Sequence, residues 1–182
     1  MGRSCSATLL WAVILSVTVG RGMVSAQSAA QPAGDLDFVA RAAMSNMAAI
    51  QLGHLATKKA QSADVKEFAQ ATIEDHLKAQ KQLADAASGA GVKWPTKLDD
   101  NYRQIEQRLS KLNNAQFDRE YMKAMIDRDR DVEKMLAARA GSAGAGESLA
   151  AKVNQWAAAT LPEVRAHLKE AEQVFGQLGR GE

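Results

Sequence analysis

The sequence predicts an all-α protein, an antiparallel four-helix bundle in up-down-up-down order, and three observations lead to that prediction. Aromatic residues make up only 5% of the chain, whereas alanine and other residues that favour helices are abundant. Apolar residues recur at steps of three and four in four long segments. Short stretches rich in Gly, Ser, Asn or Asp separate these segments, so successive helices can fold back on one another. With 182 residues, 46% hydrophobic and 24% charged, the chain has the composition of one globular domain.

The first 26 residues have the pattern of a secretory signal peptide. Arg3 precedes an uncharged apolar run at residues 7–20, and Val24-Ser25-Ala26 is a small-x-small site for cleavage after Ala26. The run is shorter than the ~20 apolar residues that a membrane-spanning helix needs, and no second run follows. We therefore expect a periplasmic or secreted protein with no transmembrane segment in the mature chain.

Processing at this site also removes charge and the one thiol. The segment contains two of the 23 basic residues, Arg3 and Arg21, and none of the 21 acidic ones, so the mature chain has equal numbers of both. A balanced charge with few aromatic residues gives no support to nucleic-acid binding. The only cysteine, Cys5, lies in the same segment, so disulfides and thiolate metal sites are not expected.

The first predicted helix covers about residues 35–60 and begins near Asp35, after a flexible polar lead-in at residues 27–34. Its apolar side chains follow the 3.6-residue period of one buried face, with Gln51 beside them. The predicted buried face consists of Phe38, Ala42, Ala43, Met47, Ile50 and His54 or Leu55.

The second predicted helix covers about residues 64–88. Asp64 and Glu67 have the spacing of a capping box, which starts a helix, and Gly89 and Gly91 end it. Its buried stripe consists of Val65, Phe68, Thr72, His76, Ala79 and Leu83.

The third segment is expected to be bent. Asp99 or Asp100 can cap a first piece, and Asn113-Asn114 can break the segment and cap a longer helix over about 115–140. The apolar line of that longer helix consists of Met122, Met125, Val132 and Leu136, with Asp129 on the same line.

A glycine-rich hinge at residues 141–146 precedes the fourth helix, in which Pro162 should produce a kink. The bundle domain is therefore predicted to span residues 35–178. The stripe of its last helix consists of Leu149, Val153, Trp156, Val164, Leu168, Ala171 and Phe175.

Polar residues on apolar stripes mark where chemistry could occur. His76, Asp129 and His167 each occupy a core position on a different helix, and an antiparallel bundle could bring them together. Imidazole and carboxylate ligands suit zinc, iron or manganese, and Glu163 and His54 are possible further ligands. The alternative interpretation is that each histidine is a hydrogen-bonded core residue and that Asp129 pairs with a nearby arginine.

Other chemistries have weaker signals. A ferritin-type di-iron site needs Glu-x-x-His on two helices, but Ile73 and Val164 stand three residues before the two histidines. Methionine pairs could hold Cu(I), although methionine more often fills core gaps. The alternating charges of residues 127–131 are interpreted as a solvated helix face. No phosphate-binding loop or Ser-His-Asp arrangement is evident, so catalysis is not predicted. The methionine pairs are Met44 with Met47 and Met122 with Met125.

Several short motifs together resemble one known family. They are residues 47–53 (MAAIQLG), 65–69 (VKEFA), Asp75-His76, residues 160–162 (TLP) and His167-Leu168. On these motifs the chain resembles the exported bacterial proteins of domain of unknown function 4142, which are often labelled outer membrane proteins. The resemblance covers about residues 38–175 and implies a ferritin-like four-helix fold and export. It brings no established activity with it.

Two positions depart from that family's pattern. The family usually has Asp-His where this chain has Arg128-Asp129, and it usually has Glu near positions 49 and 51, where this chain has Ala49 and Gln51. Asp129 could still ligate a metal, but these losses argue against a two-metal site.

The sequence therefore predicts an exported helical bundle that acts by binding an envelope partner, in maintenance or stress, without catalysis. The alternative function is a metal-binding ferritin-like bundle with a mononuclear His/Asp site.

Overall fold

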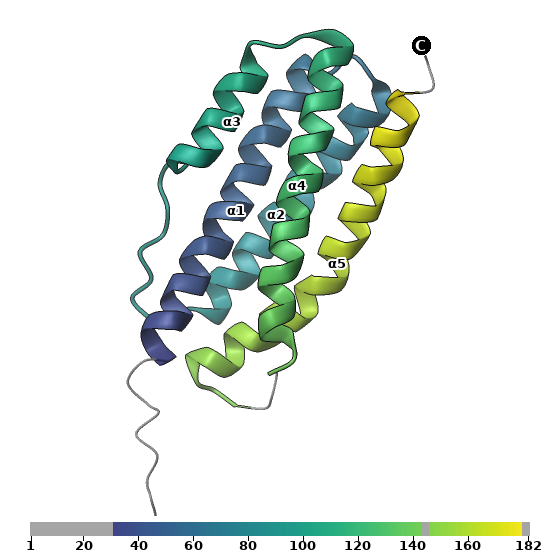
Figure 1. Cartoon of the computed structure of the whole chain (residues 1–182). Coiled ribbons are helices and arrows are strands. Elements are labelled where there is room, and N and C mark those ends of the chain that lie inside the picture. The colour runs from purple at the N-terminus through teal and green to yellow at the C-terminus, as the bar shows by residue number, and fades with distance from the viewer. Residues whose placement is uncertain (1–30, 143–145, 180–182) are drawn as a thin grey trace, which may run out of the picture.

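The computed structural model describes residues 31–142 and 146–179, and in these ranges the chain folds into five helices that pack as a bundle (Figure 1). No strand occurs in the described ranges, so the all-α prediction is confirmed. None of the helices described is both long and apolar enough to cross a membrane. The predicted signal peptide lies outside the described residues. The helices are α1 (Gln31–Lys59), α2 (Ala63–Ala86), α3 (Asp100–Ser110), α4 (Asn114–Ala140) and α5 (Leu149–Leu178).

The four long helices lie side by side, and the short α3 lies on the outside of the bundle against α1 and α4 (Figure 1). The most extensive contacts join α1 to α2 and α4 to α5, and contacts of α2 with α5 and of α1 with α4 close the ring. The predicted bent third segment is therefore two helices, of which only α4 belongs to the central bundle.

The core consists of two apolar clusters. One contains Leu52, Phe68, Phe117, Tyr121 and Met125, and the other contains Phe38, Leu83, Leu136, Val153 and Trp156. Along every long helix the residues of one cluster precede those of the other, so a layer of the bundle remains between them. Buried polar side chains occupy this layer.

The starts of α1 and α2 differ from the predictions. Helix α1 begins at Gln31 rather than near Asp35, which is compatible with a proline in the first turn, where no backbone N–H is needed. Helix α2 begins after Ser62, whose side chain accepts a hydrogen bond from the backbone N–H of Val65. The capping box at Asp64 was therefore wrong, because Ser62 occupies the N-cap two residues earlier.

The break before α4 lies where it was predicted. Asp99 caps α3 by accepting a hydrogen bond from the backbone N–H of Tyr102 at 2.9 Å. Asn114 has a φ of 54°, which turns the chain between α3 and α4. Asn113 stands at the N-cap of α4, but its side chain makes no capping bond and accepts one from Lys59 Nζ at 3.1 Å instead.

Helix α5 continues through Pro162. The N-terminal turns of α5 lie at an angle to the rest of the helix (Figure 1), as expected for a helix with an internal proline.

Candidate functional site: a buried polar layer

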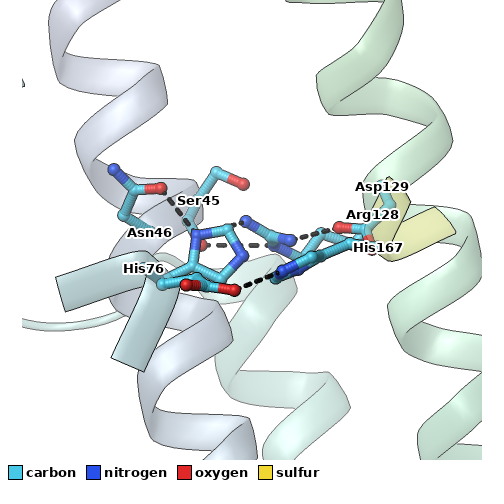
Figure 2. Close-up of polar contacts among 7 residues, drawn as sticks. Ser45, Asn46, His76, Arg128, Asp129 and His167 are labelled. Atoms are coloured by element: carbon cyan, nitrogen blue, oxygen red, sulfur yellow. Dashed lines mark hydrogen bonds and ion pairs between the residues drawn. The ribbon is translucent and has the colours of Figure 1, made fainter. Parts of the chain in front are cut away.

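The polar layer draws side chains from all four long helices. Each of these residues lies on or beside an apolar stripe, so burial of the stripe carries the polar group into the core. The layer consists of the buried Ser45 and Asn46 on α1, Thr72 and His76 on α2, Arg128 and Asp129 on α4, and the partly buried His167 on α5, most of them drawn in Figure 2.

Arg128 and Asp129 form an ion pair inside the bundle, and their side chains are 2% and 1% exposed. The Arg128 Nε also donates a hydrogen bond to the backbone carbonyl of Ser45 at 3.3 Å. The prediction of a solvated face for residues 127–131 was thus wrong for Arg128, whereas Asp129 is buried, as its place on the apolar line predicted. They lie on the side of α4 that carries Met125 and Val132, and that side is buried.

His76 lies between Asn46 and Arg128 (Figure 2). Its Nδ1 lies 3.0 Å from Asn46 Oδ1 and 3.5 Å from an Arg128 guanidinium nitrogen. Asn46 donates its amide N–H to Gln80, so its oxygen is the acceptor for a proton on His76 Nδ1. Burial lowers the pKa of His76 well below its ordinary value, and the nearby Arg128 and His167 lower it further. His76 is therefore a neutral imidazole whose Nε2 is an acceptor.

His167 approaches the same layer from α5. The rings of His76 and His167 meet edge to face, with centroids 5.7 Å apart. His167 Nε2 lies 2.8 Å from an Asp75 carboxylate oxygen. A pocket of about 10 Å³, room for about one water molecule, is lined by these residues together with Glu163. Glu163 itself is exposed and forms a 3.7 Å ion pair with Lys78.

The predicted metal ligands are only partly brought together. His76 and His167 are neighbours, and Asp129 lies in the same layer, with its carboxylate engaged by Arg128. Glu163 stands at the rim. His54 is exposed, so the prediction that it faces inward was wrong: the buried face of α1 passes through Leu52 and Ala56 instead. In residues 31–142 and 146–179, no group of three or more His, Cys, Asp or Glu side chains is arranged to hold a metal ion.

The layer also holds buried polar atoms that have no hydrogen-bond partner in the described part of the chain. One carboxyl oxygen of Asp129 pairs with Arg128, and the other has no partner among the described residues. Burial raises the pKa of Asp129, and the guanidinium of Arg128 opposes that rise. Burial likewise raises the pKa of the Tyr121 phenol above its ordinary value. The unpartnered atoms in the layer are Ser45 Oγ, His76 Nε2 and Asp129 Oδ2.

Comparison with protein families gives a match over most of the chain. The model of the family described as Domain of unknown function (DUF4142) matches residues 22–174. The chain belongs to the DUF4142 family. Comparisons with curated proteins and with solved structures find no match. The resemblance seen in the sequence is thereby confirmed at the level of the family.

In this DUF4142 chain, the alternative interpretation that Asp129 pairs with a nearby arginine is confirmed, whereas the contact of Arg128 with His76 was not predicted. The resemblance drew attention to Arg128-Asp129 in place of Asp-His, but only the structure shows the guanidinium lying between His76 and Asp129. A positive charge at this position balances the buried carboxylate without a metal ion. Ser45 and Asn46 were also missed, although their positions between Ala43 and Ala48 on the buried face of α1 were a usable signal.

Proposed function

We propose that this DUF4142 protein is an exported, ferritin-like bundle with antiparallel up-down-up-down helices that acts by binding in the bacterial envelope, including under stress, and not by catalysis. Export to the periplasm or the medium is supported by the signal-peptide pattern of residues 1–26. The family assignment supports the bundle but brings no activity.

The proposal that the protein is not a catalyst is supported by the burial of the ionisable side chains in the polar layer. A general acid or base must reach its substrate within hydrogen-bond distance. His76 is 5% exposed and Asp129 is 1% exposed, and the pocket beside His76 has room for about one water molecule. In addition, the carboxylate of Asp129 is engaged in an ion pair with Arg128. These contacts support a structural role for the layer, with binding at the surface.

Export is tested by fractionating the native host and sequencing the N-terminus of the recovered protein. We expect the chain to begin at Gln27 and to be found outside the cytoplasm. A cytoplasmic chain that begins at Met1 would contradict the proposal.

The second candidate function is a mononuclear zinc, iron or manganese site. The observation in its favour is that His76 Nε2 and Asp129 Oδ2 are buried ligand atoms with no partner in the described residues, and His167 lies beside them. The guanidinium of Arg128 opposes it, because a bound dication would meet a positive charge next to the same atoms.

Elemental analysis separates the two candidates. The protein is purified from its native compartment without chelator or affinity-tag metal, and metal is measured by plasma mass spectrometry. The binding proposal expects no stoichiometric metal. Near-stoichiometric metal that is lost in His76→Ala and Asp129→Ala, but kept in the exposed control His54→Ala, would establish the metal site instead.

A further inference from the structure

A cleft of about 500 Å³ lies between α1, α3 and α4, away from the pocket beside His76. Its size is within the range of small-molecule sites. Residues from three parts of the chain form it: the middle of α1, the start of α3 and the second half of α4.

Part of the cleft lining is apolar. Met44 from α1 and Val132 and Met135 from α4 contribute aliphatic and thioether surface, and Tyr102 from α3 contributes an aromatic side chain. Methionine side chains adapt to the shape of a bound apolar group. This part of the cleft can accept a hydrocarbon body.

Ser45 gives the lining a buried hydrogen-bonding group. It is 5% exposed, and its hydroxyl is one of the buried polar atoms that have no partner among the described residues. The hydroxyl oxygen itself is sealed from solvent, so Ser45 contributes to the wall of the cleft and not to its exposed polar surface.

The charged side chains around the cleft indicate that its occupant carries a charged head, and they indicate the sign of that charge. Asp99, which caps the start of α3, and Asp131 on α4 line the cleft, and Arg41 is the one basic residue among the lining residues. Arg41 is already held by Asp37 at 3.0 Å. Asp131 has only a 3.5 Å contact with Lys134, and both of those side chains are highly exposed. The lining therefore has more acidic than basic side chains, and its one basic side chain pairs with Asp37 outside the lining.

We propose that this cleft binds a small organic cation, an ammonium group carried on an apolar body. The ammonium lies near Asp99 and Asp131, and the body packs on Met44, Val132 and Met135. The Tyr102 ring adds a favourable surface for a cation. This inference rests on the proposed binding function and names its ligand class.

The test titrates 4-phenylbutylamine into the isotope-labelled protein and follows binding by backbone chemical shifts and calorimetry. We expect saturable shifts centred on Met44, Ser45 and Tyr102. 4-Phenylbutyrate has the same apolar body with the opposite charge, and we expect it to bind at least about tenfold more weakly.

Three variants test whether the amine binds in the cleft. Asp131→Asn and Asp99→Asn should each weaken the amine about threefold to fivefold, the range of an exposed ion pair, and asparagine at position 99 still caps α3. Lys134→Ala should tighten binding, because it leaves Asp131 without its lysine.

Asp127→Asn is the matched control, since Asp127 lies on the same helix but outside the cleft, and it should leave the affinity unchanged. The absence of saturable shifts, equal binding of the amine and the carboxylate, or equal weakening by Asp127→Asn would overturn the proposal. Metal content and export are measured separately, so this failure is distinguishable from failure of the proposed function.

Discussion

Arg128 and Asp129 are consecutive residues on α4 whose side chains pair with each other inside the bundle, where both are almost fully withdrawn from solvent (Figure 2). The guanidinium also reaches the backbone carbonyl of Ser45 on α1 and lies 3.5 Å from His76 on α2. One arginine thus joins three helices at the level where the two apolar clusters are separated. Its removal should affect the whole bundle.

Arg128→Met should lower the free energy of unfolding by about 3–5 kcal/mol, because it leaves the Asp129 carboxylate buried and unpaired. Urea denaturation monitored by circular dichroism measures this loss. Arg130→Met is the control: Arg130 pairs with Glu172 at 2.7 Å at the surface, and its loss should cost less than ~1 kcal/mol. Adding Asp129→Leu to Arg128→Met should recover most of the stability. Equal losses of unfolding free energy in the Arg128 and Arg130 variants would show that the buried ion pair stabilises the protein no more than the surface pair does.

The lowered pKa of His76 makes stability depend on pH. The unfolded chain binds a proton at His76 near pH 6.5, whereas the folded chain resists protonation until a lower pH. The unfolding free energy should therefore fall as the pH falls below about 6.5, by up to ~1.4 kcal/mol per pH unit. The raised pKa of Asp129 acts in the opposite direction, because the folded state gains its proton first as the solution is acidified.

His76→Gln should flatten this pH dependence, and His54→Gln, which changes an exposed histidine, should preserve it. Urea denaturation at intervals between pH 7.5 and pH 5 gives the slopes. If the His76→Gln protein loses stability on acidification as steeply as the unchanged protein, the proton is taken up elsewhere.

The sequence predicted the buried stripes of α2 and α4 well because helical periodicity reports directly on burial. All six predicted stripe residues of α2 are buried, including Thr72 and His76, and Asp129 lies on the buried line of α4 as expected. The burial of these residues could be predicted from the 3.6-residue period of a helix alone.

Contacts across helices were less predictable, because they depend on how far a side chain reaches. Arg128 stands within a run of alternating charges, which resembles a solvated face, yet its long side chain points inward to Ser45. His54 shows the converse: it was placed one step beyond the buried face of α1 and is exposed. Periodicity locates the centre of a stripe, but its edges are set by the neighbouring helix.

A second contact of this kind supports the turn between α1 and α2. The buried Asp118 carboxylate on α4 accepts hydrogen bonds from the backbone N–H groups of Gln61 and Ser62, at 3.0 and 2.7 Å. Asp118→Ala should lower the unfolding free energy by about 2–3 kcal/mol, since two backbone donors lose their acceptor. Thermal denaturation measures the loss, and amide hydrogen exchange at Gln61 and Ser62 should quicken.

Asp127→Ala serves as the control on the same helix. Asp127 is exposed and makes only a 4.0 Å contact with Lys123, so its removal should change the stability by less than ~0.5 kcal/mol. Unchanged exchange at Gln61 and Ser62 in Asp118→Ala would mean that the turn does not depend on this carboxylate.

The close approach of α1 and α2 depends on Gly53. A Cβ at this position would lie 2.8 Å from Ile73 Cγ1 and 3.2 Å from the backbone carbonyl of Ala69. Alanine ordinarily stabilises a helix by ~1 kcal/mol relative to glycine. Here the overlap should outweigh that gain, and Gly53→Ala should lower the unfolding free energy by about 1–2 kcal/mol.

Gly176 in α5 provides the matched comparison, because a Cβ there meets nothing within 4 Å. Gly176→Ala should raise the unfolding free energy by up to ~1 kcal/mol, so the two identical substitutions should have opposite signs. Urea denaturation of both variants in parallel gives the comparison. A stabilised Gly53→Ala protein would show that α1 and α2 can separate by a few tenths of an ångström without losing stability. In that case the close packing of the two helices would not depend on Gly53.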